Sequence, residues 1–224
     1  MKYFALALLL VSTAASAADQ RLAAAFRAAF GKSGSAILKN QGPLKESVKY
    51  TPGDVVDTAW GPVLLAQGEV LDATHANWGK LAVVYLKPAG KGFAVVSRFV
   101  PATEIGSFGK IVDYSVSNSF GPLPIVSVNG AGNWQGYACS LTTMVELAPG
   151  GPKRLVTVPM TYDNAGAVGA SRKLSQISGR IDNISLGRGF DVVYFGSKSF
   201  TDHYVRSGDS YVLASGGRSR MQTC

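Results

Sequence analysis

The sequence contains few of the side chains that most often carry catalysis or bind metal ions. It has only two histidines, His75 and His203, and two cysteines, Cys139 and Cys224. A zinc site requires three or four ligands from histidine, cysteine and carboxylate at suitable spacing, and the two histidines are far apart in the chain. No acidic D-x-D-x-D-G loop of the kind that binds calcium is present either. The sequence therefore predicts no metal site and no bound cofactor.

Charged residues are also scarce, at 16% of the chain, and acidic residues are the scarcer kind. The 14 Asp and Glu residues are outnumbered by 22 Lys and Arg residues, which gives a formal net charge of +8. A positive field favours acidic partners. The basic residues are dispersed, however, and form no Lys/Arg-rich run of the kind that marks a nucleic-acid-binding surface. We therefore expect no specific nucleic-acid binding.

No hydrophobic run is long enough to span a bilayer as a retained helix. The apolar stretch of residues 3–11 follows the basic residue Lys2 and precedes Ala15-Ser16-Ala17, which fits an A-x-A cleavage site. This order is typical of a secretory signal peptide. We predict that residues 1–17 are removed, although cleavage after Ala18 also satisfies the small-residue rule. The mature chain is then secreted or periplasmic in a bacterial envelope and has no membrane span.

The cysteine count has a direct consequence in such a compartment. Two cysteines in an oxidising environment favour a disulfide, and only the pairing Cys139–Cys224 exists. Cys224 is the last residue of the sequence, so this bond would hold a tail that would otherwise fray. The alternative is a buried Cys139 and a free thiol on the tail.

The predicted mature chain begins with residues 18–57, which combine a helix with a loop-rich lead-in. Leu22, Phe26 and Phe30 recur at four-residue spacing, and Gly31 stands where a helix C-cap glycine belongs. This pattern predicts an amphipathic helix of about three turns that packs against a sheet.

The loop-rich lead-in covers residues 31–57. Lysines and a Pro52-Gly53 turn predict loops there, with a short strand near residues 35–38. From residue 58 to 224, short segments rich in valine and aromatics alternate with turns rich in glycine and proline. About ten strands are expected, at residues 63–70, 81–86, 93–100, 110–116, 123–128, 137–147, 155–162, 180–186, 190–195 and 211–214. The pattern predicts a mainly β domain, either an antiparallel sandwich or partial propeller-like sheets.

An internal repeat supports this fold class. Residues 60–63 (WGPV) match residues 120–123 (FGPL), and Val84, Leu86, Pro88 and Gly90 match Val145, Leu147, Pro149 and Gly151. The two units extend over about residues 60–118 and 120–180, and each would supply about four strands. We therefore predict two similar sheets packed face to face, or a partial propeller that requires a partner.

The strongest candidates for ligand binding are aromatic. Trp78 and Trp134 lie in predicted turns, each beside an amide side chain, Asn77 or Asn133, and Tyr137 follows closely. An exposed indole beside polar donors is suited to bind the face of a sugar. The competing interpretation is that these rings cover the ends of a β core.

The leading functional hypothesis is a noncatalytic binding protein for an envelope or extracellular glycan, anionic or neutral. One alternative is a secreted hydrolase built on His203 and Asp202, or on His75 and Asp72. The segment 201–210 contains parts of a Ser/His/Asp set, which is recognised by geometry rather than by order in the chain. The other alternative is a structural or assembly protein of the cell envelope that uses an exposed sheet edge.

Overall fold

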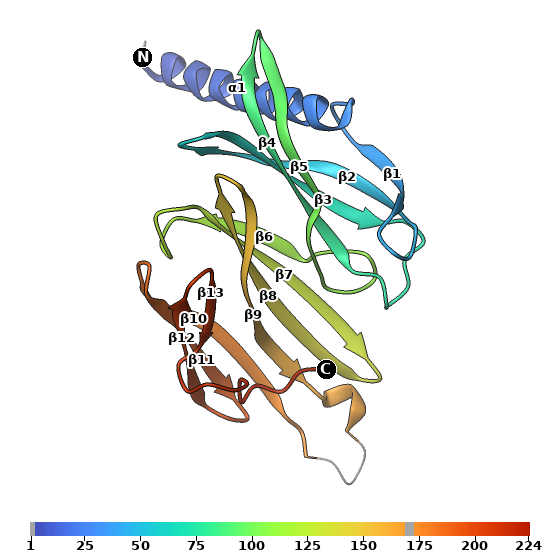
Figure 1. The fold of residues 1–224 in the computed structure, drawn as a ribbon, viewed down its shortest axis with the longest axis vertical. Helices are drawn as coiled ribbons and strands as arrows, with labels where there is room; N and C mark the ends of the chain where they lie inside the picture. The colour runs from blue at the N-terminus through green and yellow to red at the C-terminus, as the bar shows by residue number, and fades with distance from the viewer. Residues whose placement is uncertain (1–2, 169–172) are drawn as a thin grey trace.

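The computed structural model describes residues 3–168 and 173–224, and within them the protein is mostly β (Figure 1). One helix is followed by thirteen strands in two antiparallel sheets, and a short 3-10 helix precedes β10. The elements are α1 (Tyr3–Phe30), β1 (Ala36–Gln41), β2 (Glu46–Thr58), β3 (Gly61–Val70), β4 (Gly79–Ala89), β5 (Gly92–Ile105), β6 (Asp113–Ser117), β7 (Ile125–Trp134), β8 (Tyr137–Ala148), β9 (Gly151–Asp163), η1 (Ala165–Ala167), β10 (Gln176–Ser185), β11 (Gly189–Gly196), β12 (Phe200–Ser207) and β13 (Ser210–Leu213). The predicted fold class is confirmed.

The carboxyl-terminal part of α1 packs on the first sheet, which consists of β1 to β5 in sequence order. Ala25 and Phe26 are fully buried against a cluster that includes Val48, Leu64 and Val84. The helix ends at Phe30 as predicted, and Gly31 has φ +74° while its N–H donates to the carbonyl of Arg27 (2.8 Å). Only glycine adopts this left-handed conformation at little cost.

Two features of the amino-terminal region differ from the prediction. The helix is continuous from Tyr3, because no glycine or proline interrupts the Ala- and Leu-rich sequence before Gly31. The predicted loop-rich lead-in contains β1 and the 13-residue strand β2. β2 pairs with β3 along its length, and a register irregularity between Pro52 and Asp54 accommodates the Pro-Gly pair. Among the described helices, none has the length and apolar character needed to cross a membrane.

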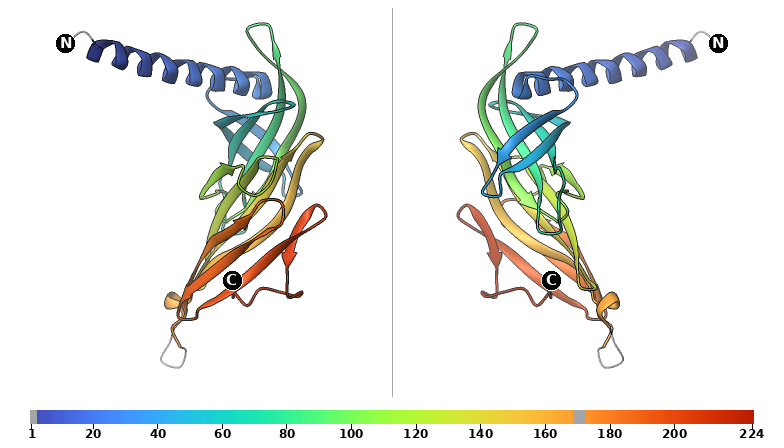
Figure 2. Two further views of the ribbon diagram at one scale, coloured as in Figure 1. Left: turned by 90° about the vertical axis from the view of Figure 1, so that its left-hand side faces the viewer. Right: turned by 90° about the vertical axis from the view of Figure 1, so that its right-hand side faces the viewer.

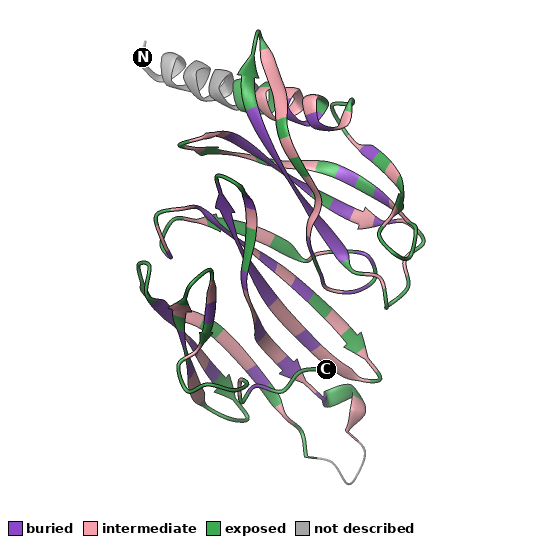
Figure 3. Ribbon diagram, viewed as in Figure 1, coloured by how far each residue is buried: buried purple, intermediate pink, exposed green. Residues whose placement is uncertain are grey.

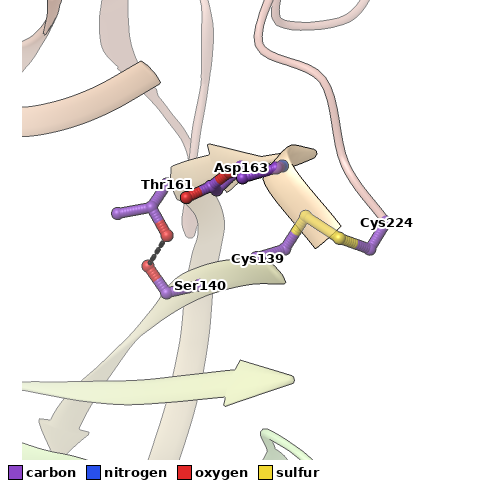
Figure 4. The surroundings of a disulfide bond; sticks show 6 residues. Cys139, Ser140, Thr161, Asp163 and Cys224 are labelled. Atoms are coloured by element: carbon purple, nitrogen blue, oxygen red, sulfur yellow. Dashed lines mark hydrogen bonds between the residues drawn. A yellow bond between two sulfur atoms is a disulfide. The ribbon is translucent and has the colours of Figure 1, made fainter. Parts of the chain in front are cut away.

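The second sheet consists of β6 to β13, also in sequence order. The side views show that this sheet curls (Figure 2). As a result, β13 contacts β9. An aromatic-rich core fills its concave side, including Phe190, Tyr194 and Tyr204. The carboxyl-terminal tail crosses this side and ends in the predicted disulfide between Cys139 and Cys224, whose Cα atoms are 5.9 Å apart (Figure 4).

The two sheets pack face to face, so the sandwich alternative is the one that is formed. Val63, Leu65 and Val83 of the first sheet are fully buried against Val126 and Val128 of the second. Buried residues run through most of β3, the first eight residues of β4 and the carboxyl-terminal half of β8 (Figure 3). The side of the first sheet that faces away from β7 and β8 receives the helix, and each face of that sheet therefore has its own core.

The first predicted repeat unit, residues 60–118, contains β3 to β6, and the second, residues 120–180, contains β7 to β9 and the start of β10. The first three strands of each unit form a meander, β3–β4–β5 and β7–β8–β9. The units do not coincide with the sheets, because β6 belongs to the second sheet, and the two sheets have five and eight strands. The hairpins β4–β5 and β8–β9 each contain two register irregularities. These irregularities shape the cavity described next. That the two meanders derive from one repeated sequence stays a prediction.

Candidate ligand-binding site

Trp78 lines a surface cavity at the junction of the two sheets, which we call the Trp78 cavity. Its volume is about 230 Å³. The other lining residues are Pro101, Ala102, Thr103 and Glu104 of β5 and Arg154 of β9. The Trp78 side chain is 54% exposed, so the indole is available to a ligand rather than buried in a core.

The loop between β3 and β4 holds Trp78 in place through its neighbour Asn77. The Asn77 Oδ1 atom accepts hydrogen bonds from the backbone N–H (2.8 Å) and the hydroxyl (2.9 Å) of Thr74. Its Nδ2 donates to Glu46 Oε1 (2.6 Å), and its carbonyl accepts from the N–H of Gly109 (2.9 Å). The amide of Asn77 therefore orders the loop and is not available as a ligand-binding group.

On the other side of Trp78, Gly79 fixes the start of β4. A Cβ atom at this position would lie 2.0 Å from backbone atoms of both Lys110 and Ile111. Only glycine permits so close an approach of two backbone segments. The indole thus projects from a backbone that is held on both sides.

Two β-bulges form the walls of the cavity. In β5, three residues from Val100 to Ala102 stand opposite the single residue Ala82, because Leu81 pairs with Thr103 and Val83 with Phe99. In β9, one extra residue lies between the positions that pair with Met144 and Val145, next to Arg154. Bulges of this kind redirect side chains locally, and here they bring β5 residues and Arg154 to one cavity.

A buried ion cluster lies behind the cavity and contacts it through Glu104. Lys80 is only 2% exposed and pairs with both Glu104 and Glu46, whose Oε2 atom is 2.7 Å from the Lys80 Nζ. Burial alone would lower the pKa of Lys80, but the hydrogen bonds to Glu104 and Glu46 outweigh it and leave the pKa above its ordinary value. Burial alone would raise the pKa of Glu46, yet the hydrogen bonds from Lys80 and Asn77 hold it below its ordinary value.

Arg154 supplies a cation that the described residues do not neutralise. Its Nη2 donates a hydrogen bond to the Thr157 hydroxyl (2.7 Å), and Thr157 is in turn hydrogen-bonded to Thr143 (2.8 Å). Among the side chains that the structure describes, in residues 17–168 and 173–224, none forms an ion pair with Arg154. The cavity therefore combines an exposed ring, a free guanidinium and a carboxylate that is already paired.

Trp134 lies elsewhere and has a different environment. It lines a separate cavity of about 70 Å³ beside Cys139 and Cys224, which shares no residue with the Trp78 cavity. Its ring covers Gly132, where a Cβ atom would meet the indole at 1.9 Å. Asn133 is exposed on the same hairpin, and the ring of Tyr137 contacts the ring of Tyr162 at 6.2 Å. The five predicted binding residues are thus not brought together.

The predicted pairing of His203 with Asp202 is not formed, because successive strand residues point to opposite faces of a sheet. Asp202 is 6% exposed on the concave side and accepts a hydrogen bond from Ser219. His203 lies on the convex side, where its Nδ1 is 2.6 Å from Asp191 Oδ1. The pKa of Asp191 lies below its ordinary value, mainly because Asn183 donates a hydrogen bond to it. Burial opposes this shift, and the contact with His203 adds to it.

The other pieces of the predicted hydrolase are dispersed. Asp209 pairs with Lys153 (2.8 Å), and the hydroxyl of Ser210 donates to the carbonyl of Ser207 (3.0 Å). His75 is exposed in the β3–β4 loop, where its ring faces Phe108 at 6.4 Å. Within the described part of the chain, no three His, Cys, Asp or Glu side chains are grouped so that they could hold a metal ion.

Glu104 and Arg154 were not among the predicted site residues. Pro101 could have pointed to Glu104, because a proline in or next to a strand pattern often marks a β-bulge. No local pattern identified Arg154, which reaches the cavity only through the packing of the two sheets. Comparison with known proteins adds no relative: no family model matches the sequence, and neither a curated protein nor a solved structure matches it significantly.

Proposed function

We propose that this protein is an exported, noncatalytic binding protein of the bacterial envelope and that the Trp78 cavity binds a saccharide. The observation that carries the proposal is the exposed indole of Trp78 beside Arg154 and Glu104 in a cavity of about 230 Å³. The volume suits a single sugar residue, and the opening to solvent allows a longer chain to continue beyond it.

The chemistry of the lining favours a sugar over a purely apolar ligand. A sugar ring has an apolar C–H face, which stacks on an aromatic ring, and a rim of hydroxyls that require hydrogen-bond partners. Trp78 offers the first contact, and Arg154 and Glu104 offer donors and acceptors at its edge. Binding sites of this kind combine an apolar surface with a few precisely placed polar groups.

Export is supported by the signal-peptide pattern and by the disulfide, since such bonds persist in oxidising compartments. We assign residues 1–17 to a cleaved signal peptide; the chain after them begins with the packed part of α1 and continues through β1 and β2, which belong to the first sheet. Of the helix side chains that the structure describes, those that pack on the first sheet, such as Phe26 and Ala29, follow the proposed cleavage site. Cleavage after Ala17 would therefore leave these contacts intact.

The test is binding of the mature protein to purified envelope polysaccharides at increasing salt concentrations. We expect binding that persists at high salt and that Trp78→Ala weakens about tenfold or more, since one stacked indole contributes on the order of 1.4 kcal/mol. The matched control is Trp134→Phe, which changes a tryptophan outside the cavity and should leave the affinity unchanged. Binding that disappears at high salt in the wild type and in both variants would reflect only the positive net charge of the protein and would refute the proposal.

The hydrolase remains a second candidate on one observation, the contact between His203 and Asp191. A carboxylate at Nδ1 orients an imidazole in the manner of catalytic bases. Hydrolysis of a chromogenic ester that His203→Ala abolishes, with folding intact, would favour this candidate over a binding protein.

A further inference from the structure

Arg154 differs from the other arginines near carboxylates in this protein. Four arginines each pair with an acidic side chain: Arg21 with Asp57, Arg180 with Asp182, Arg206 with Glu146 and Arg220 with Asp202. Arg154, by contrast, is held by the neutral hydroxyl of Thr157 alone. A guanidinium has five N–H donors in a planar fork, so most of the donors of Arg154 remain for a ligand.

Glu104 is the second charged group of the cavity, and its carboxylate is bound to the buried Lys80. Lys80 also pairs with Glu46, so these three groups together keep one negative charge behind the cavity. Glu104 therefore acts mainly as a hydrogen-bond acceptor, suited to a sugar hydroxyl. The net charge of the whole chain, +8, also attracts anions at long range.

We infer that the preferred ligand of the Trp78 cavity is an acidic sugar, a uronate whose ring face stacks on Trp78 while its carboxylate binds the guanidinium of Arg154. This inference rests on the proposed saccharide-binding function and specifies the ligand class. Arginine and carboxylate match in geometry, because two parallel N–H donors meet the two carboxylate oxygens. A uronate carries its carboxylate directly on the sugar ring. This short separation is needed because Trp78 and Arg154 line the same small cavity.

The experiment compares an oligomer of a polyuronate with the same oligomer after reduction of its carboxyl groups to neutral hydroxymethyl groups. Both are titrated into the mature protein by calorimetry at about 0.5 M salt, where charges beyond about 4 Å are screened. We expect the wild type to bind the acidic oligomer about tenfold more tightly. Arg154→Gln should remove this preference and retain binding of the neutral oligomer, whereas Trp78→Ala should weaken both.

The control variant is Arg188→Gln, which changes the net charge equally. Arg188 is exposed in the turn between β10 and β11, away from the cavity, and its replacement should preserve the preference. Arg154→Lys should give an intermediate preference, because it keeps the charge and loses the fork.

The outcomes separate this inference from the proposed function. Equal affinity of the wild type for the two oligomers would overturn the inference and leave saccharide binding intact. Loss of the preference in Arg188→Gln to the same extent as in Arg154→Gln would also overturn it, since general charge would then explain the effect. Failure of the wild type to bind either oligomer would refute the proposed function itself.

Discussion

Replacing Lys80 by methionine should destabilise the protein by leaving a carboxylate buried without a partner. The Lys80 ammonium joins Glu46 of β2 to Glu104 of β5, and both Lys80 and the Glu46 side chain are almost inaccessible to water. Glu104 is 37% exposed at its side chain and can turn to solvent when Lys80 is absent. Glu46 cannot, and its carboxylate keeps only the hydrogen bond from Asn77.

The expected loss follows from this asymmetry. Removing one partner of a fully buried ion pair costs about 3–5 kcal/mol. Because only one of the two carboxylates remains trapped, we expect Lys80→Met to lower the free energy of unfolding by about 3 kcal/mol. The neutral triple variant Glu46→Gln/Lys80→Met/Glu104→Gln removes all three charges and should lie within about 1 kcal/mol of the wild type.

The pH dependence provides a second readout. The pKa of Glu46 is lower in the folded state than its ordinary value of 4.5, so its contribution is present above pH 4.5 and is lost as the pH falls through the folded pKa. The pKa of Lys80 is raised above 10.5, so its contribution is present below pH 10.5 and is lost as the pH rises through the folded pKa. The free energy of unfolding of the wild type, relative to that of the triple variant, should therefore be largest between pH 4.5 and pH 10.5.

Urea unfolding followed by far-ultraviolet circular dichroism measures these differences, and an unchanged slope shows that the unfolded state is comparable. A loss below about 1 kcal/mol in Lys80→Met would refute the reasoning. Equal destabilisation of the single and triple variants would do so as well, because lost packing rather than an unpaired charge would then explain the effect.

Two further predictions concern the disulfide and the backbone beside Trp78. Replacing Cys139 and Cys224 by serine opens a link across 85 residues and should lower the free energy of unfolding by up to about 4 kcal/mol; limited proteolysis should then release the tail first, and an uncleaved tail would contradict its role as a tether. Gly79→Ala should cost more than about 2 kcal/mol, because its Cβ would lie 2.0 Å from backbone atoms. Gly150→Ala, at a turn with open space around it, is the matched control and should change stability by less than about 0.5 kcal/mol.

Local patterns predicted the main elements of the fold because they follow from local physics. The spacing of Leu22, Phe26 and Phe30 gave the packed part of α1, and alternation of apolar residues gave β8. Strand β2 was missed because Pro52 and Gly53 resemble a turn, and only pairing with β3 makes the segment extended. Tertiary context thus overrode the local signal.

The site was less predictable than the fold. Trp78 was identified because an indole beside an amide in a loop is a local feature. Lys80 and Glu104 are brought opposite each other by the register of β4 and β5, and Arg154 meets Trp78 only when the two sheets pack. Neither the Lys80–Glu104 pair nor the approach of Arg154 to Trp78 produces a periodic pattern in the sequence. Asn77 adjoins Trp78 in the chain, but its amide orders the loop through Thr74 and Glu46.

The most direct test of the account uses the three tryptophan indole N–H signals of the mature protein in nuclear magnetic resonance spectra. Trp60 and Trp134 serve as internal references, since neither lines the Trp78 cavity. On titration with a uronate oligomer at high salt, we expect the Trp78 signal to shift saturably while the other two stay in place. A Trp78 signal that does not move, or equal shifts of all three, would contradict the assignment of the Trp78 cavity as the binding site.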